Sequence, residues 1–248
     1  MIADLKAVVR DHETSRPRSM QTAIGPSEVG TTCARRLAYK MLAVPPVNTD
    51  SDPWAAIVGT SVHAWLDTAF ADENDRLVAR GMEARWHTSI RVDLPTYLSG
   101  TIDLYDAQTC SVIDHKVVGA TAYKRYRKDG PSRQYVIQGH VYACGLRLAG
   151  YHVEDVGIAF WSRSGALKDS FYWSEPYDEQ VVEDALARLD ALRLTTTALG
   201  VAALPMIPTA DAFCLYCPHY LPGVTEAEEA CGGHVAVPTQ PRGEPIHV

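Results

Sequence analysis

The chain has 248 residues, of which 46% are hydrophobic, and carries a formal net charge of -7 with a pI near 5.7. This length and hydrophobic content suffice for a full core, so size alone demands no stabilising disulfide or metal. The acidic balance argues against a protein that coats nucleic acid, because such binding is driven by phosphate neutralisation. The sequence has no secretory signal and no apolar run of transmembrane length, so we expect a cytoplasmic protein with reduced cysteines and no membrane partner.

The N-terminal part is predicted to be helical. A helix is expected over Ile2–Arg10, and Ser27 has the chemistry of an N-cap for the segment that carries Cys33. Cys33 is followed closely by the basic pair Arg35-Arg36. We divide the chain into an N-terminal helical segment, an α/β core, a C-terminal cysteine module and a disordered tail, at residues 1–53, 54–200, 201–237 and 238–248.

A helix is predicted over Trp54–Phe70, where the apolar residues follow helical spacing. His63 lies on this helix, and Gly59 one turn before it leaves room for the imidazole to meet another element. Asp67, one turn after His63, is placed to accept its second ring N–H and fix the tautomer, as metal-bound histidines require.

The next elements are two strands, Tyr97–Tyr105 and Cys110–Val117, joined by a four-residue turn in a predicted hairpin. Residues two apart on a strand share a face, so Asp114 and Lys116 point together. With Asp103 on the first strand, they place two carboxylates and one ammonium within reach of a single phosphate.

A basic stretch, Tyr123–Lys128, follows the hairpin. It interleaves tyrosines with cations, a composition that suits a single-stranded nucleic-acid backbone with stacked bases. The alternative is an ordinary solvated loop. The predicted nucleic-acid contacts are Lys124, Arg125, Arg127 and Lys128.

A second helix is expected over Ser132–Ala149, with Gln138 and Tyr142 one turn apart on one face. Beyond it, Val156–Trp161 and Leu167–Trp173 alternate as strands that extend the sheet. A last helix is predicted over Asp178–Leu199, ending before a glycine.

The six cysteines divide into two groups. Cys110 and Cys144 are expected to be small buried hydrophobes. Cys214 and Cys217 form a C-x-x-C pair in a Pro-rich region, which in a cytosolic protein indicates a metal or redox site. With Cys231 and His234 this pair fits a local zinc site of the C-x-x-C…C-x-x-H type.

Four short motifs occur in order: G-x-x-x-H ending at His63, G-x-x-D ending at Asp103, D-x-K ending at Lys116 and Q-x-x-x-Y ending at Tyr142. In this order they resemble the PD-(D/E)XK nuclease superfamily, specifically its RecB-like exonuclease branch. The resemblance implies an α/β, restriction-endonuclease-like core with a mixed central sheet flanked by helices. It also implies metal-assisted phosphodiester hydrolysis with Mg²⁺ or Mn²⁺.

The resemblance implies a role for each motif residue. The metal ligands would be His63, Asp103, Asp114 and the backbone carbonyl of His115. Lys116 would orient the attacking water or neutralise charge on the phosphate. Gln138 and Tyr142 would line the catalytic site, and Tyr142 would also contact DNA.

One CRISPR-associated and phage-type subset of these nucleases binds a [4Fe-4S] cluster through one cysteine before the core and three after it. Cys33, Cys214, Cys217 and Cys231 resemble that set, and four thiolates is the count that such a cluster needs. The cluster would join the N- and C-terminal segments in one metal-bound module. The gap between Cys217 and Cys231 is longer than is usual there, so structural zinc stays open as the alternative.

The expected activity is exonucleolytic cleavage of DNA, on single strands, in recombination, repair, phage DNA processing or CRISPR adaptation. A structure-specific endonuclease and a non-catalytic, metal-stapled DNA-binding subunit are the alternatives. No Walker-type phosphate-binding loop occurs, so strand separation would need a helicase or a recombination or adaptation partner in trans. The sequence determines neither the direction of cleavage along the strand nor the oligomeric state.

Overall fold

The computed structural model of the chain describes residues 1–15, 23–49, 52–94, 98–210 and 213–234. The chain divides into two compact units. The first comprises Met1–Gly30 and Asp52–Asp190, and the second comprises Thr31–Ser51 and Ala191–Val248. The tail expected at 238–248 lies outside the described residues. Within the described part of the chain, no helix combines the length and the apolar character needed to cross a membrane.

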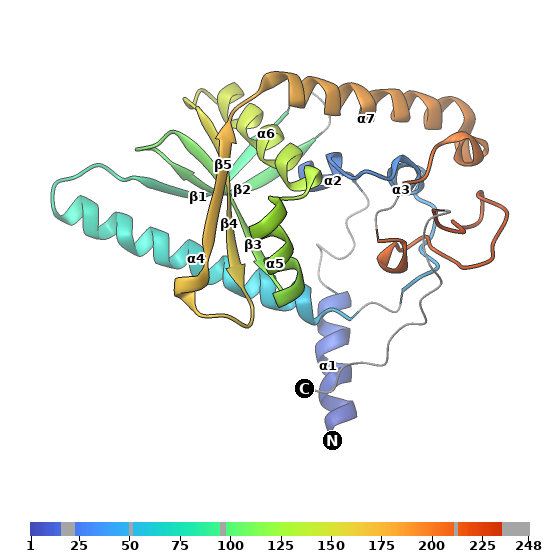
Figure 1. The fold of residues 1–248 in the computed structure, drawn as a ribbon, viewed down its shortest axis with the longest axis horizontal. Coiled ribbons are helices and arrows are strands. Elements are labelled where there is room, and N and C mark those ends of the chain that lie inside the picture. The colour runs from blue at the N-terminus through green and yellow to red at the C-terminus, as the bar shows by residue number, and fades with distance from the viewer. Residues whose placement is uncertain (16–22, 50–51, 95–97, 211–212, 235–248) are drawn as a thin grey trace. The chain divides into compact units, whose positions relative to one another are not determined.

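A mixed five-stranded sheet forms the centre of the first unit, with strands in the order β1-β2-β3-β4-β5 (Figure 1). The strands are β1 (Trp86–Asp93), β2 (Ser99–Asp106), β3 (Ser111–Val118), β4 (Asp155–Ser162) and β5 (Phe171–Pro176). β3 and β4 are parallel, and the other neighbouring pairs are antiparallel. A parallel pair needs a crossover connection, which α5 (Ala120–Asp129) and α6 (Arg133–Leu148) supply. The expected fold class, a mixed sheet flanked by helices, is confirmed.

Two helices cover opposite faces of the sheet. Successive residues of a strand point to opposite faces. On β3 the His115 ring stacks on Phe70 of α4 (Trp54–Ala79), whereas the neighbouring Asp114 bonds to Gln138 of α6. The site therefore lies where side chains from both helices reach β3. α1 (Ile2–Thr14) and α2 (Pro26–Val29) also belong to this unit, and α7 (Glu179–Leu199) contributes to both units.

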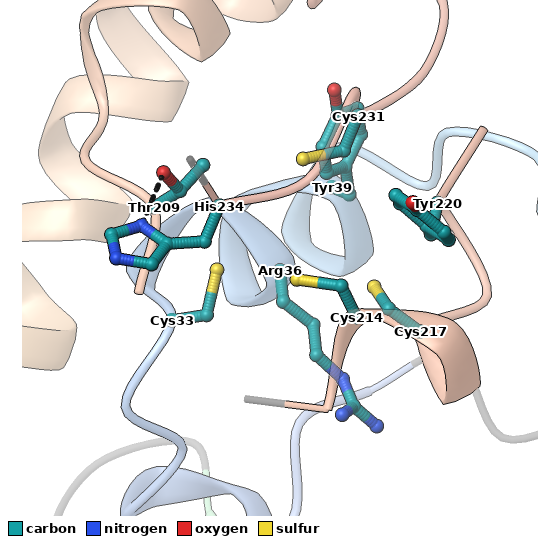
Figure 2. Close-up of a pocket in the computed structure, with 9 residues that line it drawn as sticks. All are labelled: Cys33, Arg36, Tyr39, Thr209, Cys214, Cys217, Tyr220, Cys231 and His234. Atoms are coloured by element: carbon teal, nitrogen blue, oxygen red, sulfur yellow. Dashed lines mark hydrogen bonds between the residues drawn. The ribbon is translucent and has the colours of Figure 1, made fainter. Parts of the chain in front are cut away.

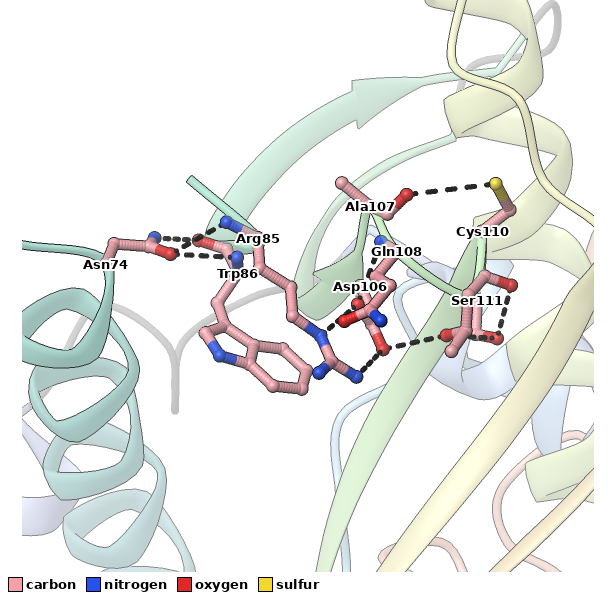
Figure 3. Close-up of polar contacts among 9 residues, drawn as sticks. Asn74, Arg85, Trp86, Asp106, Ala107, Gln108, Cys110 and Ser111 are labelled. Atoms are coloured by element: carbon pink, nitrogen blue, oxygen red, sulfur yellow. Dashed lines mark hydrogen bonds and ion pairs between the residues drawn. The ribbon is translucent and has the colours of Figure 1, made fainter. Parts of the chain in front are cut away.

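Polar contacts fasten α4 to the start of β1 (Figure 3). Oδ1 of Asn74 accepts the backbone N–H groups of Arg85 and Trp86, and its amide donates to the carbonyl of Trp86. Arg85 forms two 2.7 Å bonds with the carboxylate of Asp106 at the end of β2. Asp106 in turn accepts from Thr109 in the β2–β3 turn. This network fixes α4 against the hairpin that carries the acidic residues.

The second unit is built from two separate segments of the chain. It contains α3 (Ala34–Met41), the end of α7 and two 3-10 helices, Gly200–Met206 and Cys214–Tyr216. The side chain of Asn48 donates to the carbonyls of Leu215 and Cys217. The buried Tyr39 donates its hydroxyl to the carbonyl of Ala227. These bonds join residues far apart in the sequence into one small core.

Several elements differ from expectation at their ends. α4 begins at Trp54 as expected but continues to Ala79. The strand expected from Leu167 begins only at Phe171, because Asp169 accepts the backbone N–H of Ala166 and closes a 3-10 turn. β1 was not expected at all.

Other local expectations are wrong. Ser27 is not an N-cap, since α2 begins after Gly25, whose N–H bonds to the Glu28 carboxylate, and Cys33 is itself the N-cap of α3. Trp65, one of the apolar residues of the helix predicted over Trp54–Phe70, is 68% exposed, whereas the next residue, Leu66, is buried. Cys110 lies in the turn before β3 with φ 51°, and neither it nor Cys144 is fully buried.

Candidate active site and cysteine pocket

The pairing of β2 with β3 stops just where the acidic residues begin. The last antiparallel pair is Leu104 with Ile113, and the next residue on each strand is Asp103 or Asp114. Beyond this point the carboxylate of Asp103, rather than a backbone carbonyl, accepts the N–H of His115 at 2.8 Å. The strands therefore form a fork with both carboxylates at its base.

α4 brings His63 to this fork. Its Nδ1 lies 3.2 Å from Oδ1 of Asp103. The hydrogen bond with Asp103 is the main reason that the pKa of His63 is raised, while burial works in the opposite direction. The expected bond from His63 to Asp67 is wrong, because the Asp67 carboxylate accepts from Ser89 at 2.8 Å instead. The histidine is thus oriented across the fork and not along its own helix.

Buried Asp114 and Gln138 and partly buried Lys116 contact one another in a triangle. Lys116 Nζ lies 2.7 Å from Oδ2 of Asp114 and donates to Oε1 of Gln138 at 3.0 Å. The Gln138 amide donates to Oδ1 of Asp114 at 2.6 Å. Burial raises the pKa of Asp114 to about 6, against the opposing effect of Lys116. A cation bound at Asp114 would favour the ionised carboxylate and relieve this cost.

The side chain of His115 does not belong to the site. Its Nδ1 accepts from the indole N–H of Trp161 at 3.3 Å, and its ring stacks on Phe70. Burial lowers the pKa of His115 to about 4, so the imidazole is neutral near pH 7. The His115 ring packs edge-on against His63, with 5.9 Å between the ring centroids, while its backbone N–H bonds to Asp103 at the fork.

A single pocket of about 690 Å³ unites the predicted residues. His63, Asp103, Asp114, Lys116, Gln138 and Tyr142 all line it. Gly100 allows close packing here, because a Cβ would stand 2.9 Å from the ring of Tyr142. The sequence did not single out Arg91, which also lines the pocket and donates to Ser99 at 2.6 Å. Recognising β1 would have placed Arg91 opposite Thr101 on the site's own strand pair.

The predicted basic contacts lie on a helix and not on a loop. Lys124, Arg125, Arg127 and Lys128 all belong to α5 and are exposed. Arg125 donates to the hydroxyl of Tyr126, and Arg127 donates to the hydroxyl of Tyr123 and the carbonyl of Asp169. The two arginines are therefore tethered to the fold while they remain accessible to an anion.

A separate pocket in the second unit gathers four cysteines from both chain segments (Figure 2). Cys33, Cys214, Cys217 and Cys231 are buried free thiols, and burial is the main cause of a raised pKa at Cys217. His234 and Arg36 line the same pocket, and Nδ1 of His234 lies 3.3 Å from the Thr209 hydroxyl. Within the described ranges, no three His, Cys, Asp or Glu side chains are grouped closely enough to hold one ion. The donors fit a thiolate-ligated group in number and chemistry, although they do not form a closed ligand shell.

Comparison with solved structures agrees with this fold. No family model and no curated protein matches the chain. Among solved structures it is similar to an alkaline exonuclease (LHK-Exo) from Laribacter hongkongensis, with 13% identity and a TM-score of 0.51. That match covers 71% of this chain and 89% of the other. The same protein in complex with dAMP gives 14% identity, a TM-score of 0.50 and the same coverage. The chain therefore has the α/β fold of an alkaline exonuclease, with a restriction-endonuclease-like sheet flanked by helices.

Proposed function

We propose that this protein is a divalent-metal-dependent deoxyribonuclease that removes nucleotides from DNA ends. The observation that carries the proposal is the fork of β2 and β3, where Asp103, Asp114, His63 and Lys116 line one pocket. A protein that only bound DNA would gain nothing from paired carboxylates, which repel phosphate unless a cation bridges them. The fold likeness to an alkaline exonuclease, also known in complex with dAMP, supports the same conclusion.

His63, Asp103, Asp114 and the carbonyl of His115 would hold Mg²⁺ or Mn²⁺ at the base of the fork. The bound ion would polarise the phosphate and lower the pKa of a water molecule. Lys116 neutralises charge that develops on the phosphate, and Gln138 holds both Lys116 and Asp114 in place through its two bonds. Tyr142, on the same face of α6 as Gln138, lines the pocket against the substrate.

Single-stranded DNA is the proposed substrate. α5 offers four exposed cations beside tyrosines, an arrangement suited to a flexible backbone with unpaired bases. The overall charge of -7 confines phosphate attraction to such local patches. Because the sequence has no Walker-type motif, a helicase, recombination or adaptation partner would supply single strands in repair, phage DNA processing or CRISPR adaptation.

For the second unit we propose a [4Fe-4S] cluster bound by Cys33, Cys214, Cys217 and Cys231. The presence of Cys33 in the same pocket as the three C-terminal thiols supports the four-cysteine set. Zinc bound by Cys214, Cys217, Cys231 and His234 is the alternative, because His234 lines that pocket too. Protein purified without oxygen should be brown and contain iron for the cluster, but colourless and zinc-loaded for the alternative.

The central experiment compares end-labelled linear and circular single-stranded DNA in Mg²⁺, Mn²⁺ or Ca²⁺. Release of mononucleotides from linear strands alone supports the exonuclease, whereas cutting of the circle supports a structure-specific endonuclease with the same site. Binding without cutting in every metal would support a non-catalytic DNA-binding subunit. Lys116→Ala should be inactive. Lys168→Ala is the control, because Lys168 is exposed on the 3-10 turn Leu167–Asp169 and does not line the site pocket, and this variant should cut normally.

A further inference from the structure

Lys116 has a third neighbour that the nuclease motifs do not include. Besides Asp114 and Gln138, its ammonium faces the ring of Tyr135, with Nζ 4.5 Å from the ring centroid. Tyr135 lies on α6 one turn before Gln138, so the two side chains reach Lys116 from the same helix. A cation at this distance over an aromatic face is attracted by the ring quadrupole.

The ring differs from the two oxygen partners in an important way. Asp114 is also a proposed metal ligand, and Gln138 is bonded to that same carboxylate. Any change at Asp114 therefore disturbs both oxygen contacts of Lys116 together. The contact with the Tyr135 ring uses neither oxygen partner of Lys116, so a cation bound at Asp114 would not compete for it.

Tyr135 is itself held by aromatic packing. Its ring lies 5.6 Å from that of Tyr126, which is buried and packs 5.1 Å from Phe160 of β4. Exposed Arg125 donates to the Tyr126 hydroxyl at 3.0 Å and places its guanidinium 4.8 Å from the Tyr126 ring centroid. A continuous line of contacts thus joins the basic surface of α5 to Lys116.

We propose that Tyr135 is a positioning residue that holds the Lys116 ammonium in its working place, fixed through Tyr126 to the basic helix α5. This inference rests on the proposed role of Lys116 in hydrolysis. The aromatic ring makes the contact, so Tyr135→Phe keeps the positioning of Lys116 and Tyr135→Leu loses it.

Steady-state cleavage tests the catalytic part. We expect Tyr135→Leu to lower kcat about tenfold with KM nearly unchanged, and Tyr135→Phe to stay within about threefold of wild type. Phe171→Leu is the matched control, because Phe171 packs against the same aromatic cluster without contacting Lys116. An equal fall in kcat in the Phe171→Leu variant would mean that only the packing of the cluster matters. An equal fall in Tyr135→Phe would mean that the hydroxyl matters and not the ring. Either result would overturn the proposal.

Proton NMR tests the contact itself without any need for activity. The ε-methylene protons of Lys116, assigned with Lys116→Arg, should be shifted upfield by the ring, return to ordinary values in Tyr135→Leu and stay shifted in Tyr135→Phe. Unchanged shifts in Tyr135→Leu would overturn the proposal. If the wild-type protein did not cut DNA although these shifts behaved as expected, the proposed nuclease activity would be refuted, but the positioning of Lys116 by Tyr135 would remain supported.

Discussion

The two pockets of this protein are held in different ways. In the first unit, Asp103 accepts from His115 and Asp114 accepts from Gln138, so protein hydrogen bonds orient both carboxylates. In the second unit, four buried thiols come together from two chain segments, and thiols are weak hydrogen-bonding groups that can orient one another little. The comparison teaches that protein hydrogen bonds can orient the carboxylates of a site built on a sheet before any ion binds, whereas thiols have little means of orienting one another.

The largest expected effect is the loss of cleavage in Lys116→Ala, by about a thousandfold, because the ammonium that neutralises the charge developing on the phosphate is removed. The same change leaves buried Asp114 without its cation and should cost about 3 kcal/mol of unfolding free energy, measured by urea titration without divalent ions. Asp114→Asn/Lys116→Met should recover most of that stability while remaining inactive. A double variant no more stable than Lys116→Ala would show that the pair is not coupled.

Removing one thiol should affect only the second unit. Cys33→Ala should lower amide-exchange protection in residues 31–49 and 191–210 by about a hundredfold, because binding of the proposed cluster would be coupled to folding of this unit. Protection in the β-sheet should change little. Cys144→Ala, at a cysteine outside this pocket, is the control. Equal loss of protection in both units would contradict the expectation that the thiol stabilises only the second unit. Loss of protection in His234→Ala instead of Cys33→Ala would favour zinc.

A smaller effect is expected from the basic helix. Lys124→Gln/Lys128→Gln should reduce the slope of log affinity against log salt for single-stranded DNA by about 1.4, as two phosphate contacts are lost. Affinity should fall similarly for all base sequences, since phosphate contacts carry no sequence information. Fluorescence anisotropy at several salt concentrations measures this slope. An unaltered slope would mean that these lysines make no phosphate contacts and that α5 presents an ordinary solvated face.

The smallest effect concerns the network that fastens α4. Burial alone would raise the pKa of Asp106, but the bonds from Arg85 and Thr109 outweigh it and lower that pKa. The folded state therefore favours the ionised carboxylate, and its contribution is present above about pH 4 and is lost as the pH falls through the folded-state pKa. Asp106→Asn should cost about 1–2 kcal/mol at pH 7 and progressively less below pH 4. A cost that stayed constant with pH would exclude an electrostatic origin.

Much of the fold could be predicted from periodicity. The β2–β3 hairpin and the helix that carries Gln138 were expected within a few residues of their observed bounds, because alternation and helical spacing are local signals. β1 was not predicted although Trp86, Thr88, Ile90 and Val92 alternate along it, and of these residues only Val92 is buried in the structure. The unpaired fork at Asp103 and Asp114 also escaped prediction, since strand separation depends on neighbours that no local pattern contains.

The candidate site shows the same division. Motif order selected six side chains that line one pocket. Helical spacing gave the wrong partner for His63, because Asp67 is close in sequence whereas Asp103 is brought close only by the fold. Tyr135 and Arg91 belong to no motif, and only tertiary packing reveals them.

The interleaved second unit has a consequence for biosynthesis. Cys33 leaves the ribosome about 180 residues before Cys214, which at about 5–20 residues per second is a delay of roughly 10–40 seconds. The last strand of the sheet, β5, ends at Pro176, so every strand is made before Cys214, while Cys33 waits throughout as a thiol without its partners. Loading of any group bound by all four cysteines must therefore follow translation of the C-terminal three, and a chain that stalls before them carries a Cys33 thiol that is open to oxidation.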